Sequence, residues 1–184
     1  FFNALMKDND IDLPFLLWWP KIVRKEVINS AKIGFVNLHP SLLPYNRGKH
    51  PYYWSIVEDT PAGVSIHFIT PDIDDGEVLF QREIHKDITM TGQELYDISI
   101  VEIIDLFKNH YCDIVKLNYH TKKQDCSKST FHFAKEIKKH SEIKLEKDYK
   151  ALELINIMRA RNFPNNPSSF FYLNNKKYYV NIVI

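Results

Sequence analysis

An asparagine and a histidine two residues apart, Asn37 and His39, are the first residues whose types and spacing suggest chemistry. They lie at the end of a short apolar run from Gly34 to Pro40, which predicts a buried strand. Residues two apart on a strand face the same side, so the amide and the imidazole would project together from the strand end. Open α/β sheets bind their ligands at such ends.

A second predicted strand supplies a carboxylate. Residues 64–69 alternate like a strand and lead into the loop 70–76, which contains Asp72, Asp74 and Asp75. If the two strands are neighbours, this loop lies over Asn37 and His39. An amide, an imidazole and a carboxylate together suit attack of an amine on a carbonyl carbon, because the imidazole moves the proton and the amide stabilises the oxyanion. The alternative is structural, since such residues also form turns and cap backbone amides.

Three separated motifs occur in one order: NLHPSLLP at residues 37–44, RG at 47–48 and DDG at 74–76. Together they resemble the signature of the folate-dependent formyltransferases, N-x-H-P-S-x-L-P, then R-G, then a distant D-x-G. The resemblance implies a catalytic triad of Asn37, His39 and Asp74. It also implies N10-formyltetrahydrofolate as formyl donor and no metal.

The same resemblance implies an α/β fold in two parts. Residues 1–117 would form the later part of a Rossmann-like formyltransferase catalytic domain with a mostly parallel sheet. Apolar runs that alternate with predicted helices also favour a parallel sheet. Residues 118–184 would form a small C-terminal module with a helix and a β-hairpin. The family's catalytic domain has further strand–helix units ahead of this stretch, and the chain starts at Phe1, so we expect an N-terminally incomplete sequence.

Several elements follow from local signals. Thr91 with Glu94 fits a capping box and predicts a helix to about Lys116, with an apolar face of Leu95, Ile98, Val101, Ile104 and Leu106. Residues 118–141 show no period and predict a surface loop. Asp148 is expected to cap a last helix over 149–161, with Leu152, Ile155 and Met158 on one face, and two strands are expected about a turn at Asn174-Asn175.

Folate contacts are assigned from the resemblance. In the family, the strand end that corresponds to residues 17–19 lines the pterin pocket through main-chain contacts, and some members carry a histidine at the position of His67. The predicted folate-side residues are Leu17, Trp18, Trp19, His67, Ile69, Thr70 and Asp72. For the two tryptophan side chains, packing in the core and at the rim is an equal alternative.

Composition limits the class of protein. A chain of 184 residues with 45% apolar residues fits one globular domain with an appendage. Its longest apolar run, near residues 13–20, is too short to span a bilayer, and we see no signal peptide. Two isolated cysteines, Cys112 and Cys126, are consistent with the reducing cytoplasm. We therefore predict a cytoplasmic enzyme without a membrane partner.

Two further stretches, RGKHPYYWSIVED at 47–59 and INIMRARNFPNNPSSFFYL at 155–173, resemble the nucleotide-sugar branch of the family. The implied reaction transfers a formyl group to the amino group of a nucleotide-linked amino sugar. A dTDP-linked 3- or 4-amino-dideoxyhexose, used for surface polysaccharide such as lipopolysaccharide O-antigen, is the predicted acceptor. The C-terminal hairpin would either pair across a homodimer or pack on its own domain.

The diphosphate of such an acceptor needs basic groups. We predict contacts from Arg47 and Lys49, and from at least one of Arg159 and Arg161, since the planar guanidinium suits phosphate oxygens. The alternative is that Arg47 and Lys49 are solvated, and that Arg159 and Arg161 pair with the acidic catalytic domain.

Three rival functions fit parts of the sequence. Residues 108–184 contain 15 basic and 7 acidic residues, which also suits tRNA binding by a methionyl-tRNA formyltransferase. A catalytically idle nucleotide-binding module is the second rival. A metal-dependent hydrolase using His39, His50, Asp74 and Asp75 is less favoured, because the sequence has no close ligand spacing.

Overall fold

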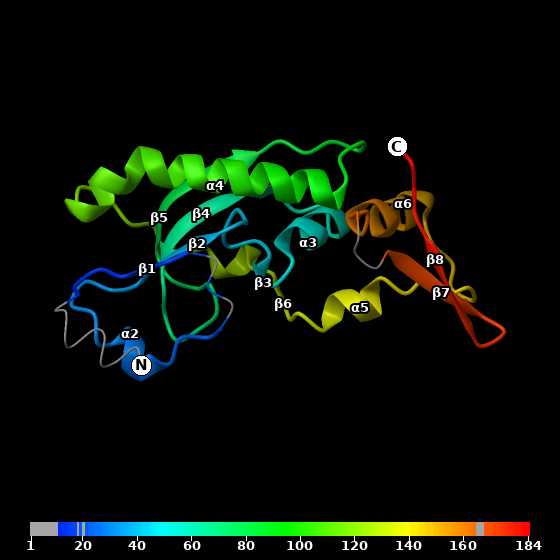
Figure 1. Cartoon of the computed structure of the whole chain (residues 1–184), viewed down its shortest axis with the longest axis horizontal. Helices are drawn as coiled ribbons and strands as arrows, with labels where there is room; N and C mark the ends of the chain where they lie inside the picture. The colour runs from blue at the N-terminus through cyan, green and yellow to red at the C-terminus, as the bar shows by residue number, and fades with distance from the viewer. Residues whose placement is uncertain (1–10, 18, 20, 165–167) are drawn as a thin grey trace.

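The computed structural model describes residues 11–17, 19, 21–164 and 168–184. Its main sheet has four strands in the order β1 (Phe15–Leu16), β2 (Val36–His39), β4 (Ala62–Phe68) and β5 (Val78–Ile84). The long helix α4 (Gly92–Val115) lies along one face of this sheet, and the C-terminal hairpin lies at the far end of the molecule from β1 (Figure 1). The predicted α/β class is confirmed.

The described sheet is mixed. β1 and β2 are parallel, whereas β4 runs antiparallel to both β2 and β5. The connection between β4 and β5 is too short for a parallel crossover, which needs a dozen or more residues. The prediction of a mostly parallel sheet therefore holds for β1 and β2 but not for the pairs that β4 makes.

Helix α4 begins at the predicted capping box: the Thr91 side chain accepts from the Glu94 N–H, and Glu94 accepts from the Thr91 N–H. Its buried stripe differs from the prediction. Leu95, Ile103, Leu106 and Ile114 are buried, and with the buried Ser99 the first of them follow three- and four-residue spacing, whereas Val101 and Ile104 are exposed. Val101 and Ile104 lie off this stripe and face solvent instead of the sheet.

Two helices join the catalytic part to the C-terminal part. α3 (Pro51–Val57) buries Tyr53, Trp54 and Ile56, and α6 (Ala151–Ala160) packs against it. α6 begins after Lys150 without a side-chain cap, so the predicted Asp148 cap is wrong. Its buried side is also different: Ile157 and Ala160 are buried, whereas Leu152 is exposed.

The C-terminal hairpin is confirmed. β7 (Ser169–Leu173) and β8 (Lys176–Val180) pair antiparallel about Asn174 and Asn175. Both asparagines have positive φ, 49° and 60°, as the twist of a two-residue hairpin turn requires. Nearer the start of the described chain lies the short helix α2 (Lys25–Ile28). Within the described residues, no helix is long and apolar enough to cross a membrane.

Residues 118–141, predicted as a surface loop, contain three short elements: the 3₁₀ turn η1 (Cys126–Lys128), β6 (Phe131–His132) and α5 (Glu136–His140). β6 pairs parallel with β3 (Arg47–Gly48), the RG motif. Elements of two to five residues are too short to show a period in sequence. This part of the chain therefore reaches the RG motif.

Candidate active site

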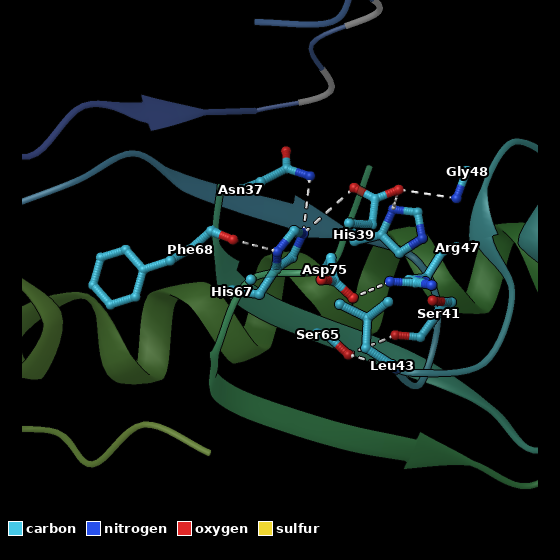
Figure 2. A network of polar contacts seen from close by, with 12 residues as sticks. Asn37, His39, Ser41, Leu43, Arg47, Gly48, Ser65, His67, Phe68 and Asp75 are labelled. Atoms are coloured by element: carbon cyan, nitrogen blue, oxygen red, sulfur yellow. Dashed lines mark hydrogen bonds and ion pairs between the residues drawn. The ribbon is translucent and has the colours of Figure 1, made fainter. Parts of the chain in front are cut away.

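The β2–β4 pair brings two polar side chains together. Asn37 on β2 lies opposite His67 on β4, and the Asn37 Nδ2 atom is 3.2 Å from the His67 Nε2 atom (Figure 2). His39 follows two residues later at the end of β2, on the same side as Asn37, as strand geometry predicts. His39 is 6% exposed and His67 is 1% exposed.

Asp74 lies between the two imidazoles. Its Oδ2 atom is 3.6 Å from His39 Nδ1, and its Oδ1 atom is 3.6 Å from His67 Nε2. The Gly48 N–H donates to Oδ2 at 2.9 Å. The structure therefore brings together all three predicted triad residues, Asn37, His39 and Asp74.

The two glycines of the motifs are needed for close approach of the backbone. Gly48 has φ of +93°, and a Cβ there would lie 2.3 Å from the carbonyl oxygen of His132. A Cβ on Gly76 would lie 1.8 Å from the carbonyl oxygen of Phe68. Gly48 thus permits the β3–β6 pair, and Gly76 permits the loop of Asp74 to lie against the end of β4.

His67 is held as a neutral ring. Its Nδ1 atom donates to the carbonyl of Phe68 at 2.7 Å, so Nε2 accepts from the Asn37 amide. Burial lowers the pKa of His67 to about 4, against the opposing charge of Asp74. His67 therefore fixes the direction of the Asn37 amide at neutral pH.

Asp74 and His39 form the ionisable part of the site. Burial alone would raise the pKa of the Asp74 carboxyl, but His39, His67, the Gly48 N–H and Lys49 outweigh burial and hold that pKa below its usual value. Asp74 is therefore ionised at neutral pH. The His39 Nε2 atom lies 3.4 Å from the carbonyl of Asn46, which leaves Nδ1 directed towards Asp74.

These side chains line one cavity of about 520 Å³. The predicted folate-side residues Trp19, His67, Ile69, Thr70 and Asp72 also line it. Leu17 does not line it and is exposed, whereas the buried Leu16 does line it. Trp18 lies outside the described residues.

The four predicted phosphate-binding residues have different environments. Lys49 lines the cavity, whereas Arg47 forms an ion pair with Asp75 and does not line it. Arg159 is 4% exposed and donates to Asn156 and to the carbonyls of Asp87 and Met90. The structure therefore does not bring Arg159 to the cavity, because its guanidinium holds α6 against the loop before α4.

Arg161 is placed differently from Arg159. Among the described residues, its buried Nε atom has no hydrogen-bond partner. Its charge reaches the cavity wall: burial, then Arg161 and Lys49, lower the pKa of His50, which lines the cavity. Arg161 itself does not line the cavity, and it lies close enough for its charge to act on His50 in the cavity wall.

Part of the cavity wall was not predicted from the sequence. It comes from α3, α4 and the segment after α4: His50, Pro51, Tyr52, Tyr96, Phe131, His132, Phe133 and Ala134. His132 stacks on Trp54 with ring centroids 3.7 Å apart, and it contacts Glu58 and Glu136. Local sequence carries no signal for such a wall, because Phe131–Ala134 reach it only through the β3–β6 pair.

Comparisons with known proteins agree with this geometry. Residues 2–100 match the family described as formyl transferase, and residues 136–184 match the family described as N-formyltransferase dimerization C-terminal domain. A methionyl-tRNA formyltransferase of Fusobacterium nucleatum is 32% identical over 170 residues, which cover 92% of this chain and 53% of that protein. The chain thus spans about half the length of this curated relative.

Two solved structures are similar over most of the chain. The first, a 4-N formyltransferase from Francisella tularensis, is 27% identical with a TM-score of 0.89, over 98% of this chain and 73% of that one. The second is the formyltransferase PseJ from Anoxybacillus kamchatkensis, in complex with UDP-4,6-dideoxy-4-formamido-L-AltNAc and tetrahydrofolate. It is 30% identical with a TM-score of 0.67, over 71% of this chain and 69% of that one.

Proposed function

The chain belongs to the formyl transferase family, and from this premise we propose that it formylates the amino group of a nucleotide-linked amino sugar, with N10-formyltetrahydrofolate as donor. The observation that carries the proposal is the convergence of Asn37, His39 and Asp74 on one cavity wall. A dTDP-linked 3- or 4-amino-dideoxyhexose for surface polysaccharide is the acceptor we favour. Support for a sugar acceptor comes from the resemblance to a 4-N formyltransferase and to PseJ.

The cavity has the size of a ligand site. Its volume, about 520 Å³, lies within the usual range for ligand sites. Leu16, Trp19 and Ile69 offer apolar surface to a pterin, with Thr70 as a polar neighbour. We assign this group, from β1 and the loop after β4, to the folate. The wall from α3, α4 and β6, together with Lys49, we assign to the acceptor.

The chain's own residues then divide the work of amide formation. Bound N10-formyltetrahydrofolate supplies the electrophilic formyl carbon, to which the amine nitrogen bonds as the bond to N10 breaks. The Asn37 amide nitrogen has two hydrogens; one is bound by His67, and the second is free to stabilise negative charge on the formyl oxygen. His39 takes the proton that the amine loses and passes a proton to the leaving N10 nitrogen, while Asp74 orients His39 and accepts protons through water.

The test is an assay of acceptor classes. The full-length protein is incubated with N10-formyltetrahydrofolate and, separately, with dTDP-3-amino and dTDP-4-amino dideoxyhexoses, UDP-linked amino sugars and methionyl-tRNA. Mass spectrometry then detects the added formyl group. We expect a formamido sugar nucleotide. Formylation of methionyl-tRNA, with every sugar nucleotide unchanged, would contradict the proposal.

Methionyl-tRNA formyltransferase activity is the second candidate. It is favoured by the similarity to the Fusobacterium nucleatum protein over 92% of this chain and by the basic residues 108–184. The match of residues 136–184 to an N-formyltransferase dimerization domain favours the sugar acceptor instead. Salt dependence separates the two, because binding of a polyphosphate weakens steeply with ionic strength.

We also propose a homodimer formed through the C-terminal hairpin. The hairpin carries exposed apolar and aromatic side chains, namely Tyr172, Leu173, Tyr178 and Tyr179. The dimerization-domain match covers the whole hairpin. Light scattering of the purified full-length protein tests this state directly.

A further inference from the structure

One glutamine links the segment after α4 to the loop of Asp74. We call residues 119–134 the returning segment, because the chain here runs back from the end of α4 to the cavity (Figure 1). Lys122 pairs with Val78 at the start of β5 through two backbone hydrogen bonds of 2.9 Å. Two residues later, the Gln124 Nε2 atom donates to the carbonyls of Asp74 and Gly76, both at 2.8 Å.

The loop of Asp74 needs such a partner. Asp74 has φ of +50°, a conformation that few residues other than glycine adopt. Gly76 lies against the carbonyl of Phe68. The carbonyls of Asp74 and Gly76 converge on one point, and a primary amide nitrogen carries the two hydrogens that satisfy both. Without Gln124, each carbonyl would lose this partner.

The returning segment also holds the other side of Asp74. Thr130 accepts from the Arg47 N–H, and β6 pairs with β3 so that the Lys49 N–H donates to His132. β3 in turn presents the Gly48 N–H to the Asp74 carboxylate. The main chain of Asp74 is thus fixed by Gln124, and its side chain is fixed by a strand that the same segment supports.

We propose that Gln124 is a positioning residue for Asp74, which it holds within reach of the His39 imidazole. The inference rests on the formyl transfer proposed above. Gln124 does not line the cavity and acts only through the loop 74–76. Its place in the reaction is therefore to set the distance from the Asp74 carboxylate to His39 Nδ1, which is 3.6 Å.

Two substitutions in the full-length protein test this role. Gln124→Met removes both donors at similar size, and Gln124→Glu places a carboxylate against two carbonyls. We expect kcat to fall by about tenfold to a hundredfold, since small misplacements of catalytic groups cost that much, with KM for both substrates little changed. Gln93→Met, which removes a side-chain bond to Asp97 on α4, is the matched control and should retain parental kcat.

The pH profile separates positioning from general damage. His39, His67, Lys49 and the Gly48 N–H hold the pKa of Asp74 below its usual value. If Asp74 moves away from them in Gln124→Met, its pKa rises, and an NMR titration of the Asp74 side-chain carboxyl measures this rise. A loss of rate with an unshifted Asp74 pKa would match only a smaller folded fraction and would overturn the inference.

A second readout does not depend on activity. Because the Gly48 N–H donates to Asp74, its hydrogen exchange reports whether the carboxylate is in place. We expect exchange at Gly48 to be faster in both Gln124 variants, while amides in the middle of β4, such as Ile66, keep parental rates. Unchanged exchange at Gly48 would refute the role of Gln124 even if formyl transfer is found. If the parent formylates no acceptor, the proposed reaction fails, and the exchange measurement still decides the contact.

Discussion

The Asn37 amide lies 3.2 Å from the imidazole of His67, directly across the antiparallel pair of β2 and β4. His67 accepts from this amide because its own Nδ1–H is taken by the carbonyl of Phe68. The orientation of the Asn37 side-chain amide is therefore set by His67 on the neighbouring strand β4. The other face of the site is set by Asp74, which lies between His67 and His39.

The first prediction concerns the triad. His39→Ala removes the base, and Asp74→Asn removes the charge that orients His39 while keeping nearly the same shape. Loss of general acid–base catalysis reduces rates by about 10²- to 10⁴-fold, so we expect kcat to fall by at least this much, with the sugar nucleotide still bound. Steady-state kinetics and calorimetric titration measure the two effects. Asp97→Asn on the outer side of α4 is the control, and near-normal rates in the triad variants would refute the assigned roles.

The second prediction concerns His67 and stability. Its pKa in the folded state is lowered to about 4 from 6.5, so the unfolded chain binds more protons between these values. The contribution of a neutral His67 is complete above pH 6.5 and is lost as pH falls towards 4, by about 3 kcal/mol. The variant His67→Leu removes this one ionisable group and keeps its neighbours Asp74 and His39 in the sequence.

Urea unfolding at pH 7 and pH 4.5 measures this effect. In His67→Leu, the difference in unfolding free energy between the two pH values should be smaller than in the parent. His85→Leu, at an exposed position after β5, should keep the parental difference. An equal pH dependence in the His67 variant would show that this histidine is not held neutral.

The third prediction concerns Gly76. In Gly76→Ala the new methyl group would lie 1.8 Å from the carbonyl oxygen of Phe68, so the loop of Asp74 must move. Overpacking of this kind typically costs about 1–3 kcal/mol of stability. We expect a lower Tm and a larger loss in kcat than the fraction of unfolded protein explains. A variant with parental kcat would show that the loop tolerates the shift without moving the carboxylate.

Arg161 and Arg159 give the fourth prediction, because the structure gives them different surroundings. Arg161→Ala should raise KM for the sugar nucleotide by about an order of magnitude or more, the effect of losing a charge-assisted phosphate contact of about 1.5–3 kcal/mol. Arg159→Ala should lower Tm and leave KM unchanged, since its donors hold Asn156 and the carbonyls of Asp87 and Met90. A raised KM in Arg159→Ala with an unchanged KM in Arg161→Ala would assign the phosphate contact to Arg159 and not to Arg161.

Sequence spacing and motif order predicted that Asn37, His39 and Asp74 come together. Two-residue periodicity placed Asn37 and His39 on one side of a strand, and the motif order identified Asp74. Asn174 and Asn175 marked the hairpin turn, because their side chains tolerate positive φ. Each of these signals is local or lies in a fixed motif.

What the sequence did not predict depends on tertiary contacts. Phe131–Ala134 reach the site through strands of two residues each, and Gln124 follows a single β-bridge between Val78 and Lys122. Contacts this short show no period in the sequence. From the sequence, Arg159 is expected to be a basic surface residue. In the structure it is buried, because it donates to the carbonyls of Asp87 and Met90. The boundary between residues 117 and 118 stays a prediction, as do the roles in folate binding.

The fifth prediction concerns the face of the hairpin that forms the proposed homodimer. The register places Phe171, Leu173 and Tyr178 on one face, and Phe170, Tyr172 and Tyr179 on the other. Lys177 lies over the rings of Phe170 and Tyr179, so a charged group already covers that second face. The first face has exposed Leu173 and Tyr178, with Tyr178 stacked on Phe171.

We therefore expect two copies of the chain to meet through the face of Leu173 and Tyr178. Tyr178→Asp places a charge in this interface and should shift the protein to monomers at concentrations where the parent is dimeric, because a buried unpaired charge opposes association. Tyr172→Asp makes the same change on the covered face and should stay dimeric. Light scattering across a concentration series measures both variants. Dissociation of the Tyr172 variant alone would assign the interface to the other face, and a monomeric parent would remove the homodimer.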